Sequence, residues 1–270
     1  MGNIIIFGSN GNIGKEIVNH LKSQNNIFLD TKFTINRLLS KDFINNNRIN
    51  CIINCIGSSK DKDLYFSSNF IMPFIISDKI SKLDSYIKHK IKFIYISTIG
   101  VNAPYMKYNF KNISYTNLKK SKINYNNYEL SKSCGEFVVL KNTNNLKNIS
   151  TLILQPSNII LKNSIFLKNL CIFLYLFPFK INHSIEIPIT PINYLLKYID
   201  QIIYSEFKNK LIIKKLYKRE KIHKLFKGRS FFSILKFEIP LNIMQKIIKC
   251  MPENHLTSSL KRRLILIFIL

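Results

Sequence analysis

Tyr128 and Lys132 stand one helical turn apart in the segment YELSK, and their chemical types suit proton transfer. Residues four apart lie on one face of a helix. A lysine cation beside a phenol favours the phenolate and lowers its pKa, so the tyrosine becomes a usable acid–base group near neutral pH. About thirty residues earlier, an apolar segment ends in Ser97 and Thr98, whose hydroxyls could hydrogen-bond a reacting oxygen. We therefore predict a catalytic site at Thr98, Tyr128 and Lys132, with Ser97 as the alternative to Thr98. A chance match, in a chain with 13 Tyr and many Lys, is the competing interpretation.

A glycine-rich segment near the start of the chain predicts a phosphate-binding loop. It follows an apolar strand and precedes an amphipathic helix, which is the context that gives such a motif its meaning. One glycine allows a tight turn, the next lets the backbone approach a pyrophosphate, and the third lets the helix and the strand pack closely. The free N–H groups at the start of the helix would bind the phosphates. The predicted cofactor-binding residues of this loop are Gly8, Ser9, Asn10, Gly11, Asn12, Ile13 and Gly14.

Asp30 lies about twenty residues further on, where the second predicted strand ends. A carboxylate at this position accepts hydrogen bonds from ribose hydroxyls and repels a 2′-phosphate, which favours NAD over NADP. Lys32 lies close by and could pair with a 2′-phosphate, so NADP stays an alternative. A surface aspartate without a ligand is the structural alternative.

The elements that must position these residues alternate between strand and helix, which predicts a parallel α/β sheet. A near-continuous apolar run at 51–56 is typical of a central strand that is buried on both faces. We expect a Rossmann-type doubly wound parallel sheet, with an NAD(P)-binding domain at 1–160. Residues 161–270 would form a smaller substrate-binding lobe and a C-terminal tail, partly interleaved with the first domain. The expected strands are 3–7, 27–29, 51–56, 92–97 and 151–154, and the expected helices are 13–21, 34–43, one from Pro73, 125–141 and one after Pro191.

The formal net charge of +26 is the most unusual property of the composition. Such a charge is typical of proteins that bind nucleic acid or anionic membranes. Here the lysines are scattered through the chain together with many Asn and Ile, which favours a compositional bias of the genome. No usual nucleic-acid motif is present, so a nucleic-acid partner is disfavoured. An anionic substrate and a membrane surface remain alternatives.

The end of the chain leaves two interpretations open. A basic cluster, Lys261 to Arg263, precedes the apolar residues Leu264–Leu270. This tail could make a peripheral membrane contact, or it could form a last segment of the core. The apolar segment Leu170–Phe179 is too short to span a membrane, and we expect Leu170–Phe177 to be a helix or a buried segment.

Cysteine and histidine residues show no spacing typical of a metal site or of a disulfide framework. The five Cys therefore favour core thiols in a reducing compartment, and we predict a cytoplasmic protein without a metal. These residues are Cys51, Cys55, Cys134, Cys171 and Cys250, with His20, His89, His183, His223 and His255.

Taken together, the motifs resemble those of the extended short-chain dehydrogenases/reductases, the NAD-dependent epimerase/dehydratase family. The resemblance covers about residues 1–160 and preserves the order and spacing of the motifs. One departure is Gln155, where many members of the family have arginine, so a charged contact would be missing. The matching segments are IIIFGSNGNIG, IINCIG, Asn69 before the next helix, FIYISTIGV, YELSK and LQPSNI.

The resemblance implies roles for residues that chemistry alone does not assign. Tyr128 would be the catalytic acid–base group, Lys132 would bind the nicotinamide ribose, and Thr98 would complete the triad. Ile56 and Gly57 would border the adenosine, while Pro156, Ser157 and Asn158 would lie near the nicotinamide. The implied activity is hydride transfer through a keto intermediate of a nucleotide sugar, and the implied assembly is a homodimer. Three alternatives stay open: a keto-sugar or small-carbonyl reductase, a non-catalytic cofactor-binding subunit, and an RNA- or membrane-surface binder.

Overall fold

The computed structural model describes residues 2–59, 61, 63–102, 128–161, 179–180, 186–206, 211–221 and 235–238. Residues 103–127, the segment Leu170–Phe177 and the C-terminal tail lie outside these residues. The chain divides into two compact units, 1–155 with 196–215, and 156–195 with 216–270. The predicted boundary at residue 160 stays a prediction.

The first unit is built around a six-stranded sheet in the order β2-β1-β3-β4-β5-β9. The pairs β1–β2, β1–β3, β3–β4 and β4–β5 are all parallel, so the predicted parallel α/β sheet is confirmed. The strands are β1 (Gly2–Phe7), β2 (Asn25–Leu29), β3 (Cys51–Asn54), β4 (Ile91–Ile96), β5 (Ile149–Pro156) and β9 (Leu211–Leu216).

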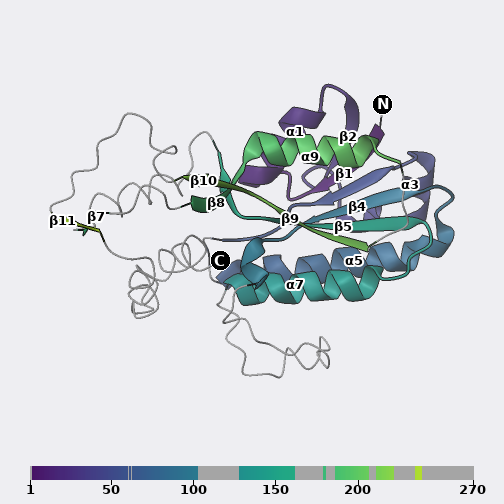
Figure 1. Ribbon diagram of the computed structural model, residues 1–270. Coiled ribbons are helices and arrows are strands. Elements are labelled where there is room, and N and C mark those ends of the chain that lie inside the picture. The colour runs from purple at the N-terminus through teal and green to yellow at the C-terminus, as the bar shows by residue number, and fades with distance from the viewer. Residues whose placement is uncertain are drawn as a thin grey trace, which may run out of the picture. The chain divides into compact units, whose positions relative to one another are not determined.

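Helices cover both faces of this sheet, α1 and α9 on one side and α5 and α7 on the other (Figure 1). The residues of α9 from Leu196 onward belong to the first unit, and there Asp200 pairs with His20 of α1 at 2.6 Å. The helices are α1 (Asn12–Leu21), α2 (Ile35–Leu38), α3 (Lys41–Asn46), α4 (Asp63–Phe66), the π-helix η1 (Ser67–Ile71), α5 (Met72–Leu83), the 3₁₀ turns η2 (Asp84–Tyr86) and η3 (Ile99–Asn102), α7 (Tyr128–Thr143) and α9 (Ile192–Tyr204).

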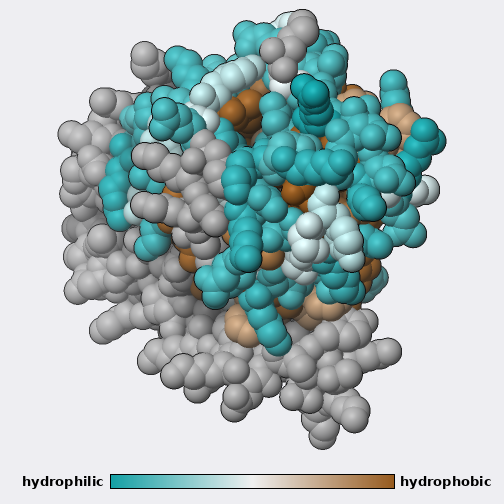
Figure 2. All heavy atoms as spheres, turned by 90° about the vertical axis from the view of Figure 1, so that its right-hand side faces the viewer, coloured by the Kyte–Doolittle hydropathy of each residue, from teal (hydrophilic) through white to brown (hydrophobic). Residues whose placement is uncertain are grey.

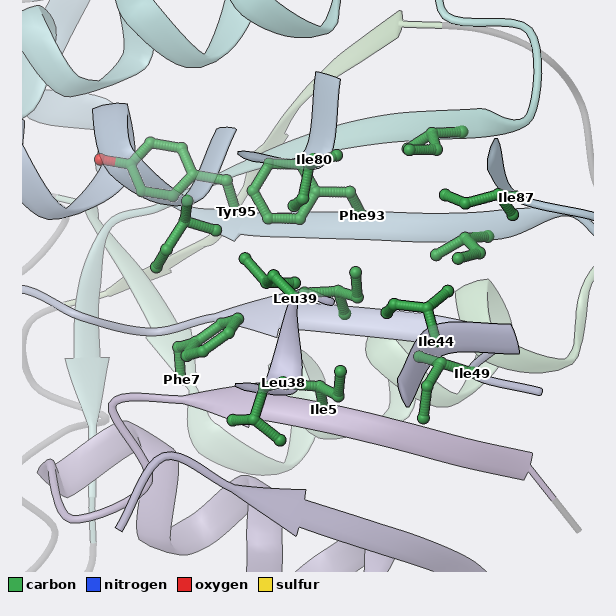
Figure 3. Close-up of a cluster of buried hydrophobic side chains, with 14 of the residues drawn as sticks. Ile5, Phe7, Leu38, Leu39, Ile44, Ile49, Ile80, Ile87, Phe93 and Tyr95 are labelled. Atoms are coloured by element: carbon green, nitrogen blue, oxygen red, sulfur yellow. The ribbon is translucent and has the colours of Figure 1, made fainter. Parts of the chain in front are cut away.

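One large core cluster of the first unit lies on the α5–α7 side of the sheet, where side chains of β1, β3, β4 and β5 meet those of α2, α3, α5 and α7 (Figure 3). The other face is also buried, with Ile17 of α1 and Ile199 of α9 fully enclosed. Every residue of β3, β4 and β5 is buried, which explains why the sequence of β3 is apolar without alternation. On the face shown in Figure 2, hydrophilic side chains cover most of the described surface, with small apolar areas between them. Among the described residues, no helix is both long and apolar enough to cross a membrane.

The sheet ends at β2, one strand earlier than the standard dinucleotide-binding order 3-2-1-4-5-6. Residues 30–50 are all described, and they form two short helices and no strand. The single helix predicted at 34–43 is therefore wrong. Ser40 interrupts it, because its hydroxyl accepts the N–H of Phe43 at 3.3 Å and begins a new helix. Phe28 of β2 and Phe43 of α3 pack edge to face at 5.1 Å beside this connection.

A buried lysine fastens the end of α9 to the centre of the sheet. Lys92 of β4 is 8% exposed. Its Nζ donates hydrogen bonds to the carbonyls of Ile202 at 2.6 Å, Ile203 at 2.9 Å and Ser205. The last carbonyls of a helix have no partner within the helix, so the ammonium satisfies them and complements the negative end of the helix dipole.

The second unit contains two small sheets. The first has the order β10-β8-β6 and the second pairs β11 with β7. Thr190 is fully buried, and its hydroxyl donates to the carbonyl of Leu216 at 2.5 Å. Its strands are β6 (Asn158–Ile160), β7 (Phe179–Lys180), β8 (Glu186–Pro191), β10 (Lys218–Lys221) and β11 (Leu235–Glu238).

Candidate active site

The glycine loop between β1 and α1 can exist only with glycine at two of its positions. Gly8 has φ +78°, and a Cβ there would lie 2.7 Å from the backbone nitrogen of Ile56. A Cβ on Gly14 would lie 2.1 Å from the carbonyl oxygen of Gly8. Ordinary side chains do not fit either distance. The loop, the first turn of α1 and the end of β3 therefore approach one another at backbone distance.

The first turn of α1 is open to an anion. The helix begins at Asn12 after Gly11, and no side chain caps it. The first N–H groups of a helix have no acceptor within the helix and carry the positive end of its dipole. Asn10, Gly11 and Asn12 are exposed, whereas Ile13 is half-buried. These residues fit a pyrophosphate, which needs backbone donors and close access to the chain.

Asp30 is bound to the glycine loop at the end of β2. Its carboxylate accepts the backbone N–H of Gly8 at 2.7 Å and that of Ser9 at 3.3 Å, together with the Ser9 hydroxyl at 2.7 Å. The side chain is half-buried. Three hydrogen bonds to a charged acceptor are strong and fix its orientation. The Asp30 carboxylate is therefore held beside the glycine loop. This position fits the predicted contact with the ribose of an adenosine.

Lys132 lies on α7 with its ammonium buried among the ends of β3 and β4. It is 5% exposed, and its Nζ donates to the carbonyls of Ile96 at 3.2 Å and Ile56 at 3.5 Å. Burial lowers the pKa of Lys132 to about 8, against the smaller opposing effects of Cys55 and Glu136. A Cβ on Gly57 would lie 2.6 Å from this Nζ, so the chain approaches the ammonium as closely as glycine permits.

Tyr128 begins the described part of α7, one turn before Lys132. It is half-buried, and its ring packs edge to face on the ring of Tyr65 at 5.7 Å. The helix thus places Tyr128 and Lys132 as the spacing predicts. The polar segment that precedes Tyr128 lies outside the described residues.

Of the two hydroxyls at the end of β4, Ser97 is engaged elsewhere. Its Oγ donates to the carboxylate of Glu136 at 2.6 Å in the interior. Thr98 is 7% exposed, and its Oγ1 accepts the N–H of Gly100 at 3.3 Å. The Thr98 hydroxyl proton is not used by that bond, since Oγ1 is the acceptor. The geometry therefore favours Thr98 over Ser97 as the third polar group of the candidate site.

The π-helical turn η1 places Asn69 beside the chain segment that follows Gly57, close to Lys132. Asn69 is fully buried. Its amide accepts the N–H of Ser58 at 2.9 Å and donates to the carbonyl of Ser58 at 2.8 Å and to the Ser131 hydroxyl at 3.0 Å. A Cβ on Gly135 of α7 would lie 2.0 Å from the Asn69 carbonyl. The amide therefore holds the chain after Gly57 in place beside Lys132. Asn69 belongs to one of the motifs found in the sequence, but the motif gives it no role, and the helical pattern contains no signal for a π-turn.

Gln155 does not leave a gap where many related enzymes have arginine. Its Nε2 donates to both carboxylate oxygens of Glu136, at 2.8 and 3.0 Å. Glu136 was not predicted as part of the site, although its position four residues after Lys132 puts it on the same helical face.

Pro156 and Ser157 belong to the second unit. There Ser157 donates from its N–H to Thr190 at 2.9 Å and from its hydroxyl to the Pro188 carbonyl at 2.7 Å, and the predicted nicotinamide contacts stay predictions.

The described residues contain no group of three or more His, Cys, Asp or Glu side chains that could hold a metal ion. The described cysteines Cys51, Cys55 and Cys134 are free thiols. Burial raises the pKa of each of them to about 12, so they are neutral and inert near pH 7.

No protein-family model matches the sequence, and no curated protein sequence matches it. Solved structures do match the fold. The dTDP-4-dehydrorhamnose reductase of Bacillus anthracis, in complex with NADP, is 18% identical with a TM-score of 0.55, over 88% of this chain and 85% of the reductase. The UDP-glucuronic acid 4-epimerase of Bacillus cereus, in complex with NAD, is 14% identical with a TM-score of 0.54, over 93% of this chain and 83% of the epimerase.

The enzyme WbmH of Bordetella bronchiseptica, in complex with NAD⁺, is 13% identical with a TM-score of 0.56, and the match covers 91% of each chain. Identities this low carry information about the fold alone. The parallel sheet, the glycine loop between β1 and α1 and these structural matches agree with the sequence-based resemblance. The chain therefore has a Rossmann-type parallel α/β fold, which it shares with these solved structures.

Proposed function

We propose that the protein is an NAD(P)-dependent enzyme of the extended short-chain dehydrogenase/reductase type that acts on a nucleotide sugar. The observation that carries the proposal is the buried ammonium of Lys132, which the Ile96 and Ile56 carbonyls hold one turn from Tyr128. Parallel α/β sheets bind ligands at the carboxyl ends of their strands. Gly8, Asp30, Gly57 and Thr98 all follow the carboxyl ends of such strands.

In this proposal the residues of the chain divide the work between binding and proton transfer. The glycine loop and the start of α1 bind the pyrophosphate, and Asp30 binds the adenosine ribose. The nicotinamide supplies the hydride acceptor or donor. Tyr128, as the phenolate, removes the proton from a sugar hydroxyl as that carbon is oxidised to a ketone. Thr98 hydrogen-bonds the same oxygen, and the charge of Lys132 favours the phenolate.

The keto sugar would then be epimerised or dehydrated, and the cofactor would be regenerated within the same turnover. A reductase of the same fold would instead release a reduced sugar and an oxidised cofactor. A high positive charge suits a substrate that carries a diphosphate, and the chain has a formal net charge of +26. A cytoplasmic location, a homodimer and a membrane contact of the tail stay predictions.

A panel of UDP-, dTDP- and GDP-linked sugars and 4-keto sugars tests the proposal. The full-length protein is incubated with each sugar and each of NAD⁺, NADH, NADP⁺ and NADPH. Mass spectrometry follows the sugar, and absorbance follows the reduced nicotinamide. Conversion without net cofactor consumption supports an epimerase or dehydratase, and stoichiometric consumption supports the reductase. Failure of all four cofactors to bind, measured by titration calorimetry, would contradict the proposal.

The charge of Asp30 predicts a preference for NAD(H). Asp30→Asn can still accept the Gly8 N–H through its amide oxygen and donate from its NH2 group to the Ser9 hydroxyl, although the longer bond from the Ser9 N–H is lost. It removes the negative charge that repels a 2′-phosphate. We expect the ratio of the Kd values for NADPH and NADH to fall by about tenfold, which corresponds to about 1.4 kcal/mol. Fluorescence titration with NADH and NADPH measures this ratio. Asp42→Asn, an equal charge change at an exposed residue of α3, should leave it unchanged; an equal shift in both variants would argue against a specific role of Asp30.

A further inference from the structure

A buried carboxylate lies one helical turn beyond Lys132. Glu136 is 8% exposed and accepts hydrogen bonds from the Ser97 hydroxyl at 2.6 Å and from the Gln155 amide at 2.8 and 3.0 Å. Both donors are neutral groups, and among the described residues no cation forms an ion pair with this carboxylate. The negative charge of Glu136 is therefore stabilised by hydrogen bonds without being cancelled at close range.

The same end of β4 holds two of the charged side chains of α7, those of Lys132 and Glu136. The carbonyl of Ile96 accepts from the Lys132 ammonium, and the hydroxyl of the next residue, Ser97, donates to Glu136. Lys132 and Glu136 are four residues apart, so they lie on one face of the helix. Strand β4 thus fixes the two side chains relative to each other through consecutive residues.

The groups that face Lys132 differ in the charge they can supply. Cys55 follows β3, Tyr95 lies on β4 with its ring centroid 5.5 Å from the Lys132 Nζ, and Tyr128 lies on α7 one turn before Lys132. Burial raises the pKa of Cys55 to about 12 and raises that of Tyr95 well above its usual value. Cys55 and Tyr95 are therefore neutral near pH 7.

Glu136 differs from these groups, because both of its carboxylate oxygens accept hydrogen bonds, as an ionised carboxylate does. Burial raises its pKa, whereas the Ser97 and Gln155 hydrogen bonds and the charge of Lys132 oppose that effect. Burial lowers the pKa of Lys132 and so favours the neutral amine, whereas the charge of Glu136 acts to raise that pKa. Each charged group therefore favours the charged form of the other.

We propose that Glu136 is a positioning residue which keeps Lys132 protonated and holds the Ser97 hydroxyl away from the reacting oxygen. Its consequence for catalysis rests on the proposed function, since Lys132 would act on Tyr128. Gln155 contributes to this role, because it binds the Glu136 carboxylate through two hydrogen bonds and adds no positive charge. An arginine in its place would neutralise Glu136 and weaken its effect on Lys132.

Direct titration of the Lys132 ammonium tests the proposal without a substrate or a cofactor. Lysines are labelled with ¹³C at Cε, and NMR follows their shifts with pH. The Lys132 signal is the one absent from Lys132→Met. In the wild type we expect it to titrate near pH 8. In Glu136→Gln, which keeps acceptors and donors for Ser97 and Gln155, we expect its pKa to fall by about one unit.

Two further variants separate the charge from the packing. Gln155→Arg keeps the Glu136 carboxylate and adds a cation beside it, so the pKa of Lys132 should also be lower than in the wild type. Glu16→Gln removes the same charge from an exposed site on α1 and should leave the titration unchanged. Circular dichroism and thermal melting report whether each variant folds. An unchanged Lys132 pKa in a folded Glu136→Gln or Gln155→Arg variant overturns the proposal.

A readout of turnover extends the test to the proposed function. Once a substrate is known, the alkaline limb of the pH profile of kcat/KM should move to lower pH in Glu136→Gln and in step with the Lys132 titration. If the titration shifts and the pH profile does not, Glu136 sets the charge of Lys132 but the proposed role of Lys132 in catalysis fails. The two failures are thus distinguishable.

Discussion

Tyr128→Phe should lower turnover by a factor of about 10²–10⁴, the usual contribution of a general acid–base group. The ring remains, so its edge-to-face contact with Tyr65 and the fold of α7 should persist. Only the hydroxyl that would take the proton of the sugar is lost. The affinity for NADH should therefore stay within about twofold of the wild type, because the predicted phosphate and ribose contacts lie on the glycine loop and Asp30.

Steady-state kinetics with the identified sugar and fluorescence titration with NADH provide the two measurements. Tyr65→Phe is the matched control, because it removes a phenol hydroxyl from the other ring of the same pair. That hydroxyl donates to the Ser59 carbonyl at 3.2 Å, and its loss should leave turnover near the wild-type value. Unchanged turnover in Tyr128→Phe would exclude Tyr128 as the acid–base group.

Gly14→Ala should abolish cofactor binding and destabilise the first unit. The new Cβ would lie 2.1 Å from the Gly8 carbonyl oxygen, 2.9 Å from the Gly8 carbonyl carbon and 3.0 Å from the Ser9 Cα. All of these are backbone atoms, so no side-chain rotation relieves the clash, and the loop must move away from α1. We expect Kd for NADH to rise by more than about 100-fold and the free energy of unfolding to fall by about 1–3 kcal/mol.

Gly11→Ala separates the two expected effects of a methyl group in the loop. A Cβ there meets only the Gly8 carbonyl oxygen, at 3.2 Å, and its backbone has φ −70°, which any residue adopts. The free energy of unfolding should therefore change by less than about 1 kcal/mol, whereas the exposed methyl would still obstruct a pyrophosphate. Urea denaturation and NADH titration of both variants measure this. A Gly14→Ala protein with wild-type affinity would contradict the assignment of the loop.

The parts of the fold that the sequence predicts well are those governed by local pattern. The strand–glycine–helix order places the loop, and the near-continuous apolar run at 51–56 identifies β3 as a buried strand. The Tyr–Lys spacing places both residues on α7. Asp30 was expected to bind only a ribose. Its hydrogen bonds to Gly8 and Ser9 depend on the parallel pairing of β1 and β2, which no local pattern specifies.

The features that sequence analysis missed depend on contacts between distant segments. Ser40 splits a predicted helix because its hydroxyl competes for the N–H of Phe43, a choice that apolar periodicity does not reveal. Glutamate is usually found at the surface of a protein, so the sequence gives no sign that Glu136 is buried. Only the approach of β4 and β5 buries it against Ser97 and Gln155. The functional roles of Thr98, Tyr128 and Lys132 stay predictions.

The π-helical turn η1 has a consequence for how this site tolerates insertions and deletions. A π-turn holds one residue more than the α-helical turn it replaces, and the helix continues on either side as α4 and α5. Deleting one residue between Ser67 and Ile71 would restore a continuous α-helix, which is a regular structure. It would also turn the Asn69 amide away from Ser58 and Ser131 and change the register against Gly135. The local backbone would thus gain regularity as the candidate site lost its support, so this chain should be more sensitive to the loss of a single codon here than to most substitutions.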